Sequence, residues 1–413
     1  MIIGHQTRWF TSRKEITMKT RQSIVRFPSR LKDLRKCMEW GVLFPAVYML
    51  SLGGPAIAQQ HTITTIDAPG AFNSSGHGTE GIAITPWGAI AGFYADQKNA
   101  MHAYVRATDG RIITFDAPGA ASSGEEIPFP TVGASPGTYA VGIDVWGAVT
   151  GYSIDAFNVS HGYLRYPDGT FTAIDVLEAG KGDGQGTSPG SMNWAGVITG
   201  NYVDASGAWH GFVRARDGAI TKFDAPGAGT EAGQGTMGGW AQCINPVGTI
   251  VGYFIDANNV IHGFVRDHGG VITTLEAPGA GTEAGQGTFT WAINPSGAVA
   301  GTFLDSHNVY HGLVRTADGS MEVFDAPGAG TGADQGTQGM GIDPAGEVTG
   351  YYTDATGVSH GFLRSAHGEF TYLDVQDAGR GSGQGTFPMT NTQAETTGFY
   401  VDSNNVWHGF VRK

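Results

Sequence analysis

The sequence predicts an all-β fold: a seven-bladed β-propeller with four antiparallel strands per blade, closed by the N-terminal strand joining the last blade. Its 413 residues include 66 Gly and only 15% charged residues, a composition that suits short strands and many turns. A His-Gly-Phe-Val-Arg segment, or a close variant, recurs seven times at spacings of 48 to 59 residues. The copies begin at His102, His161, His210, His262, His311, His360 and His408.

Each copy belongs to a unit with four strand signals, which are clearest between residues 291 and 325. Asn-Pro-Ser-Gly at 294–297 and Ala-Asp-Gly at 317–319 are turn sequences. The alternating apolar stretches that they separate are the expected strands, at 291–293, 298–304, 310–315 and 320–325. Four short strands every ~40–50 residues is the spacing of a propeller blade.

The phase of the array predicts how it closes. Ile63 to Asp67 reads as a fourth strand that has no unit of its own, and the last unit ends at Arg412 without a fourth strand. Pairing the first strand with the last unit completes that unit and removes an exposed edge. A β-solenoid is the alternative, although it would need shorter turns and capping repeats.

The second hairpin of each unit can be predicted residue by residue. A three-residue loop pairs Asp256 with Val260, places Asn259 in the left-handed conformation and sets Tyr253 opposite Gly263. The residues equivalent to Asn259 are all Asn or Gly, which tolerate positive φ. They are Asn99, Asn158, Gly207, Asn308, Gly357 and Asn405.

We expect two parts in the chain: a basic leader with a signal peptide at 1–58, and the seven-repeat propeller domain at 59–413. Ala56-Ile57-Ala58 follows an apolar segment and fits a signal-peptidase site. An uncleaved membrane anchor is the alternative, because the apolar segment approaches spanning length. Cleavage implies a secreted protein, extracellular or periplasmic, with no membrane contact afterwards. Translation could also begin at Met18.

Charge and composition limit the partners. Residues 59–413 keep 14 of the 24 Lys and Arg but 34 of the 37 Asp and Glu, a net charge of −20 that repels nucleic acid. No Gly-x-Gly-x-x-Gly sits between a strand and a helix, and no zinc-ligand spacing occurs. We therefore expect no cofactor, no metal and a monomer. Specific calcium sites are the open alternative, because the Asp-x-x-Asn turns faintly resemble calcium loops.

The repeat resembles the HAF family of bacterial extracellular repeat proteins, which is named for a His-Ala-Phe core. That core reads His-Gly-Phe in four units here and His102-Ala103-Tyr104 in the first. The similarity covers about residues 62–413. It implies an exported bacterial protein with a propeller-like fold, and it carries no established activity or catalytic residues.

The repeated Asp and His residues are the obvious candidates for catalysis. Asp256 with His262 and Asp305 with His311 fall on one face of their hairpins as diagonal neighbours. An Asp–His pair could orient a general base. Seven copies argue against a single active site, so we interpret these residues as a structural repeat with a buried Asp–His hydrogen bond, and we assign no catalytic residue.

The long Gly-rich segments are the strongest candidates for binding. Residues 225–236 recur almost unchanged at 277–288, and both link the outer strand of one unit to the inner strand of the next. By strand count they share a rim with the Asp-x-x-Asn turns, and long loops on a rigid scaffold are a common place for binding. They could also be simple connectors. The predicted ligand-binding residues are Glu231, Gln234, Thr236, Glu283, Gln286 and Thr288.

Three functions remain open. The leading one is an exported, non-catalytic binding propeller whose ligand is unknown, with glycans and envelope proteins as candidates. The second is a propeller hydrolase or lyase acting on carbohydrate, with a carboxylate pair at the loop-rich face. The third is a structural adhesive repeat protein. Similar loops in adjacent units favour repeated binding over a single active site.

Overall fold

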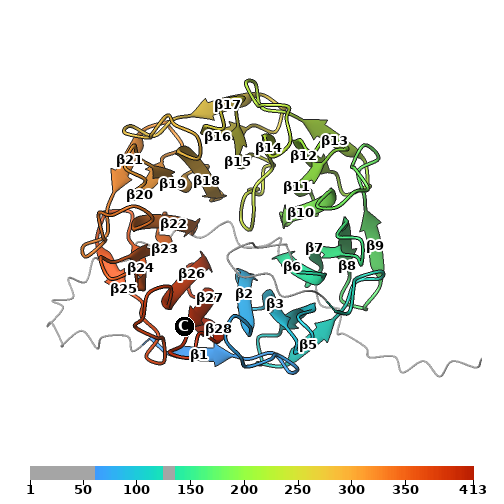
Figure 1. Ribbon diagram of the computed structural model, residues 1–413, viewed down its shortest axis with the longest axis horizontal. Helices are drawn as coiled ribbons and strands as arrows, with labels where there is room; N and C mark the ends of the chain where they lie inside the picture. The colour runs from blue at the N-terminus through green and yellow to red at the C-terminus, as the bar shows by residue number, and fades with distance from the viewer. Residues whose placement is uncertain (1–60, 124–134) are drawn as a thin grey trace, which may run out of the picture. The chain divides into compact units, whose positions relative to one another are not determined.

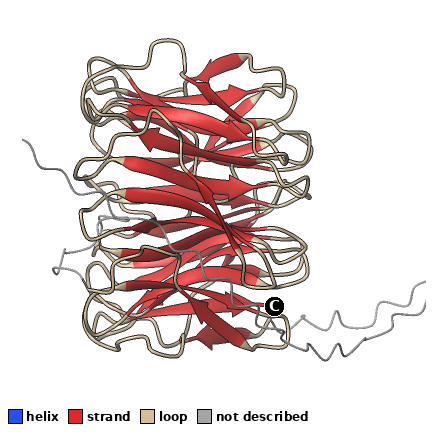
Figure 2. Cartoon of the chain, turned by 90° about the vertical axis from the view of Figure 1, so that its right-hand side faces the viewer, coloured by secondary structure: helices blue, strands red, loops and turns tan. Residues whose placement is uncertain are grey.

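The described part of the chain consists of strands and turns. The structure, a computed structural model, describes residues 61–123 and 135–413, all within the unit Gln59–Lys413. These residues form 28 strands and no helix (Figure 2), which confirms the all-β prediction. Within the described residues, no helix could cross a membrane. The leader predicted at 1–58 lies outside them.

The strands form seven antiparallel runs arranged about a common axis, and the first strand of each run lies nearest the axis (Figure 1). The first three runs are β2 (Thr79–Ile84), β3 (Ile90–Ala95), β4 (Met101–Arg106) and β5 (Ile112–Phe115); β6 (Gly137–Ile143), β7 (Val149–Ile154), β8 (Ser160–Arg165) and β9 (Phe171–Ile174); and β10 (Gly186–Met192), β11 (Ile198–Val203), β12 (Trp209–Arg214) and β13 (Ile220–Phe223). The next three are β14 (Gly235–Met237), β15 (Ile250–Ile255), β16 (Ile261–Arg266) and β17 (Ile272–Leu275); β18 (Gly287–Ile293), β19 (Val299–Leu304), β20 (Tyr310–Arg315) and β21 (Met321–Phe324); and β22 (Gly336–Ile342), β23 (Val348–Thr353), β24 (Ser359–Arg364) and β25 (Phe370–Tyr372). The seventh run is β26 (Gly385–Asn391), β27 (Thr396–Val401) and β28 (Trp407–Arg412), and β28 also pairs with β1 (Ile63–Ile66).

The first strand of the chain lies beside the last, which is the pairing that the phase of the repeats predicts. β1 and β28 are antiparallel, with Ile63 opposite Arg412 and Ile66 opposite Gly409. Ile66 is only 2% exposed. At the end of β1, the Asp67 carboxylate lies 2.7 Å from His408 Nδ1. The edge of β28 is therefore covered by residues more than 340 positions away in the sequence.

The second hairpin has the predicted register. Tyr253 lies opposite Gly263, and the Asp256 N–H donates to the carbonyl of Val260 across the three-residue loop. Asn259 has a φ of +63°, and the equivalent Asn or Gly is left-handed in every run. The sequence preference at this position therefore reflects the backbone angle that the loop requires.

Adjacent runs are joined by one repeated contact. The third strand of each run meets a Gly-Thr pair at the start of the next run, as where Ile261 bridges Gly287 in parallel. The Gln286 carbonyl accepts a 2.9 Å hydrogen bond from the Ile261 N–H, and the Thr288 hydroxyl oxygen accepts one from the Ala277 N–H at the same distance. The equivalent glycines are Gly78, Gly137, Gly186, Gly235, Gly336 and Gly385, all with positive φ.

Two nearby glycines test whether this junction limits stability. Gly287 has a φ of +123°, and a Cβ there would overlap the Ile261 carbonyl. Gly285 has a φ of +82° and open space around its Cβ position. We expect Gly285→Ala to lower the free energy of unfolding by about 1 kcal/mol, the usual cost of a left-handed alanine. Gly287→Ala should lower it by about 3 kcal/mol, because the two runs must also separate. Guanidinium unfolding measures both changes, and equal losses would contradict this role for the junction.

Candidate functional site

A cavity of about 440 Å³ lies on the axis, where the first strands of the runs end. Its wall includes one residue from the same position in each run, and six of the seven are apolar. They are Ile84, Ile143, Met192, Ile244, Ile293, Ile342 and Asn391. A mostly apolar hollow with a few polar groups is the usual form of a small-ligand site.

The cavity opens among the tight turns that follow the first strands. These turns lie at the opposite end of the strands from the long loops 225–236 and 277–288, because each of those loops leads into the start of a first strand. The structure therefore places its axial cavity on the rim that the sequence interpretation did not select for binding.

Asparagine side chains hold the mouth of the cavity together. Asn245 and Asn294 each accept a hydrogen bond at Oδ1 from an N–H four residues later, at 2.9 Å, which closes the turn. The amide Nδ2 of Asn193 donates to the carbonyl of Asn245, and that of Asn294 donates to the carbonyl of Asp343, each at 3.0 Å. These bonds connect the turns of neighbouring runs, so the mouth is braced before any ligand arrives.

The fourth run departs from the others and inserts a segment at the axis. Its first strand, β14, has only three residues, and the segment between β14 and β15 extends into the middle of the ring (Figure 1). Trp240 and Ala241 pack against the apolar cluster formed by the first two runs. Gln242, with a φ of +62°, donates from Nε2 to the carbonyl of Asn391 in the seventh run at 2.9 Å. Residues 240–242 thus cross the axis.

Three tryptophans project from the same rim. Trp87, Trp146 and Trp194 lie in the turns after the first strands of the first three runs and are 71%, 77% and 53% exposed. Trp87 and Trp194 line the cavity, whereas Trp146 does not. An exposed Trp beside a hollow is suited to stacking on a ligand, because the ring is large and mostly apolar.

Four of the six predicted ligand-binding residues are buried and brace the loops. The Thr236 hydroxyl oxygen accepts a 2.8 Å hydrogen bond from the Ala225 N–H. Gln234 accepts at Oε1 from the Glu231 N–H and donates to Asn259 at 3.2 Å. Gln286 and Thr288 make the corresponding contacts in the next loop. Their polar atoms are engaged within the protein, so the predicted residues that remain open to a ligand are Glu231 and Glu283, which are exposed.

The Asp–His pairs are brought together, but their geometry differs from a simple buried hydrogen bond. Asp256 Oδ1 accepts the turn N–H groups of Asn258 and Val260, both at 2.8 Å, while Oδ2 lies 3.5 Å from His262 Nε2. His262 Nδ1 makes the shorter contact, 2.5 Å to Glu276 at the end of β17.

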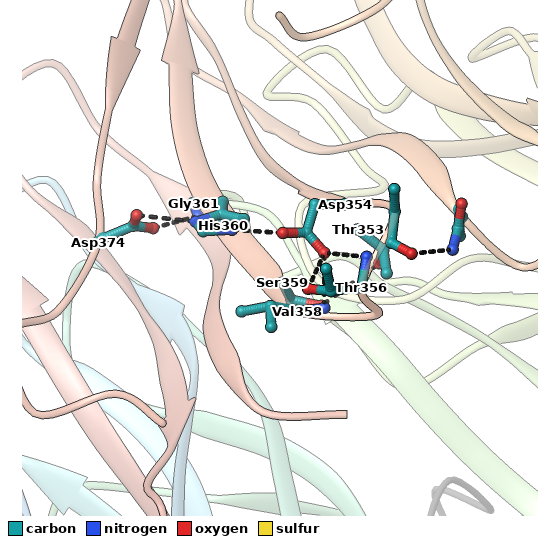
Figure 3. Close-up of polar contacts among 10 residues, drawn as sticks. Thr353, Asp354, Thr356, Val358, Ser359, His360, Gly361 and Asp374 are labelled. Carbon is teal, nitrogen blue, oxygen red and sulfur yellow. Dashed lines mark hydrogen bonds and ion pairs between the residues drawn. The ribbon is translucent and has the colours of Figure 1, made fainter. Parts of the chain in front are cut away.

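Other runs repeat this arrangement. His311 lies 3.6 Å from Asp305 and 2.8 Å from Asp325. Figure 3 shows His360 between Asp354 and Asp374. The histidine rings are 15–42% exposed, so these groups are not buried, which corrects that part of the expectation.

Each histidine therefore joins its hairpin to the outer strand of the same run. In most runs the ring also stacks on an aromatic residue of the second strand, as His262 does on Phe254 at 4.8 Å between centroids. Hydrogen bonds to Asp116 and Asp67 raise the pKa of His102 and of His408, respectively. The contacts account for a structural role in every copy.

Carboxyl groups with raised pKa lie outside the cavity lining. Burial raises the pKa of Glu80 to about 8, and burial also raises the pKa of Asp343 and of Glu347. The lining in the described residues contains neither Asp nor Glu. Among residues 61–123 and 135–413, no cluster of three or more His, Cys, Asp and Glu could hold a metal ion.

No protein-family model matches the chain, and a search of curated proteins finds no match. Solved structures with a similar arrangement include the BP39L lectin from Burkholderia pseudomallei, with 10% identity, a TM-score of 0.48, and 82% of this chain and 96% of that chain covered. TolB from Acinetobacter baumannii is 12% identical, with a TM-score of 0.41 and 83% of this chain covered. A puromycin hydrolase is 10% identical, with a TM-score of 0.44 and 80% of this chain covered. This chain spans 65% of the TolB chain and 50% of the hydrolase chain.

Proposed function

We propose that the described unit is a seven-bladed β-propeller with four strands per blade, in which β1 completes the last blade. Seven antiparallel runs, seven equivalent Gly junctions and the β1–β28 pairing support this interpretation. We further propose that the protein belongs to the HAF repeat family and is exported. The His-Gly-Phe repeats support the first proposal, and the basic leader ending in Ala56-Ile57-Ala58 supports the second.

We propose that this propeller binds a neutral glycan, without catalysis, at the mouth of its axial cavity. The observation that carries the proposal is the position of Trp87 and Trp194, which are exposed and flank an apolar hollow. A sugar ring has apolar C–H faces that stack on indole, while its hydroxyl groups need hydrogen-bonding partners beside that platform. The braced turns of the mouth favour binding, because little ordering is needed when a ligand arrives.

Hydrolysis has less support at this cavity. Most glycoside hydrolases use two carboxyl groups on either side of the scissile bond. The described lining residues provide none, because Glu80, Asp343 and Glu347 are not among them.

The loop rim remains a second candidate for binding. Glu231 and Glu283 are exposed at equivalent positions of adjacent runs, as a repeated site requires. Acidic side chains of that kind suit a basic partner surface rather than a neutral sugar.

Tryptophan substitutions test the cavity site. Trp87→Ala and Trp194→Ala should each weaken glycan binding roughly 5- to 150-fold, because each removes a stacking platform worth about 1–3 kcal/mol. Thermal stability should change little, since both side chains are mostly exposed. A glycan array followed by calorimetry on the best hit measures the effect.

Trp146→Ala is the matched control, because Trp146 lies on the same rim but does not line the cavity. It should bind like wild type. A double Glu231→Ala, Glu283→Ala variant tests the loop rim in the same assay. Loss of glycan binding in that variant, with Trp87→Ala unaffected, would move the site to the loop rim.

A further inference from the structure

Two of the amide side chains that line the axial cavity, those of Gln242 and Asn391, have a buried oxygen without a hydrogen-bond partner among the described residues. Asn391 is the single polar member of the seven wall residues and is only 1% exposed. Gln242 reaches it from the segment that crosses the axis and also lines the cavity. The two amides therefore come from different runs, Gln242 from the fourth and Asn391 from the seventh.

The hydrogen bonds of these amides fix which atoms remain free. Gln242 Nε2 donates to the Asn391 carbonyl, and Asn391 Nδ2 donates to the Glu347 carbonyl at 3.0 Å. A carbonyl only accepts, so neither amide can be flipped without losing its bond. Gln242 Oε1 and Asn391 Oδ1 have no hydrogen-bond partner among the described residues and almost no accessible surface, so both side chains must shift before a ligand in the cavity reaches these oxygens.

An acceptor buried without a donor lowers stability, and a ligand that supplies the donor recovers that free energy. We infer that Gln242 and Asn391 receive two hydroxyl groups from one end of the ligand, which enters the cavity end-on as a neutral polyhydroxylated molecule such as a terminal sugar residue. This inference rests on the proposed glycan-binding function and adds the residues that select the ligand's end.

An ammonium group is a second chemistry that could donate hydrogen bonds to these oxygens. The cavity disfavours it, because burying a cation is costly unless a carboxylate pairs with it. The described lining has no Asp or Glu, and the amide oxygens carry only partial charge. A hydroxyl group needs no counter-charge and can donate to one amide oxygen while its own oxygen lies toward the mouth.

Two substitutions remove the acceptors and leave the shape nearly unchanged. Asn391→Ile introduces the residue found at this position in five other runs, so the variant should fold. Gln242→Met removes the amide and keeps the length of the side chain. Gln338→Met is the matched control, since Gln338 lies on a first strand but does not line the cavity.

The probes are the methyl pyranosides of glucose, mannose, galactose and fucose, with glucosamine as the cationic comparison. Saturation-transfer NMR and titration on the full-length protein measure binding. We expect a neutral glycoside to bind, about tenfold weaker binding in Asn391→Ile and in Gln242→Met, and wild-type binding in Gln338→Met. Removing the contacted hydroxyl from the probe should weaken binding to wild type but not further weaken binding to Asn391→Ile.

The outcomes separate the two proposals. Wild-type affinity in folded Asn391→Ile and Gln242→Met, together with loss of binding in Trp87→Ala, would overturn this inference and leave the glycan site in place. Binding of glucosamine alone would also overturn it. If none of the probes bound wild type and no glycan on the array did, the proposed function would fail and the inference with it.

Discussion

Deleting residues 59–67 should lower the free energy of unfolding by roughly 5 kcal/mol or more, or prevent soluble expression. The deletion removes β1, whose Ile66 is almost fully buried, and loss of such a side chain alone costs about 2–5 kcal/mol. It also removes the ladder to β28 and the contact between Asp67 and His408. The uncovered edge of β28 would then be free to pair with another chain. Guanidinium unfolding and light scattering measure the two consequences.

A peptide with the sequence of residues 59–67 provides the control. Added to the deleted protein, it should pair with β28 and restore part of the lost stability, because binding to the native state stabilises that state by mass action. A scrambled peptide should have no effect. Unchanged unfolding and monodispersity in the deleted protein would show that β1 does not close the ring.

The elements that could be predicted from sequence are those set by local backbone chemistry or by the phase of the repeat. The left-handed conformation of Asn259 and its equivalents follows from the rule that Asn and Gly tolerate positive φ. The β1–β28 pairing follows from two features of the repeat, namely the unmatched strand signal at 63–67 and the missing fourth strand of the last unit. Neither prediction required knowledge of side-chain packing.

The candidate site could not be predicted in the same way. In the sequence, the additional residues of the fourth unit are visible only as a spacing of 52 residues, instead of 49, between two successive His-Gly-Phe segments. No local sequence pattern indicates that this insertion crosses the axis and reaches Asn391. The tryptophans offered a clearer signal. Trp87, Trp146 and Trp194 occur in tight turns, where a large apolar side chain has little to pack against.

The bracing contacts of the loop residues follow from the same kind of repetition. Repetition in every unit favours a structural role for the Asp–His pairs, and a Gly-Thr pair recurs in every unit in the same way. This reasoning indicates the bracing contacts of Thr236 and Thr288, whose part in ligand binding stays a prediction. Their partners, Ala225 and Ala277, lie eleven residues earlier, a separation that no local motif identifies.

Glu80 is a buried acid whose pKa is raised by that burial, and it should make stability depend on pH. It lies in β2 opposite Phe93 and is 9% exposed. Burial raises its pKa from 4.5 to about 8. Burial also raises the pKa of the neighbouring Tyr104 and Tyr152, and the charge of Glu80 adds to that rise. The folded protein therefore holds the carboxyl group protonated at neutral pH.

Glu80→Gln should consequently stabilise the protein, and by an amount that grows with pH. The unfolded chain ionises Glu80 near its ordinary pKa of 4.5, whereas the folded chain does so only near 8. Protonated Glu80 therefore makes its full contribution to the free energy of unfolding below pH 4.5. This contribution declines as the pH rises from 4.5 to about 8, and it is constant above pH 8. Glutamine cannot ionise, so the variant should exceed wild type by almost nothing at pH 4 and by about 4 kcal/mol at pH 8. Guanidinium unfolding at pH 4, 6 and 8 measures the difference, with exposed Glu231→Gln as the control. A difference in unfolding free energy between Glu80→Gln and wild type that stays constant from pH 4 to pH 8 would contradict this prediction. It would mean that Glu80 has the same pKa in the folded and unfolded states.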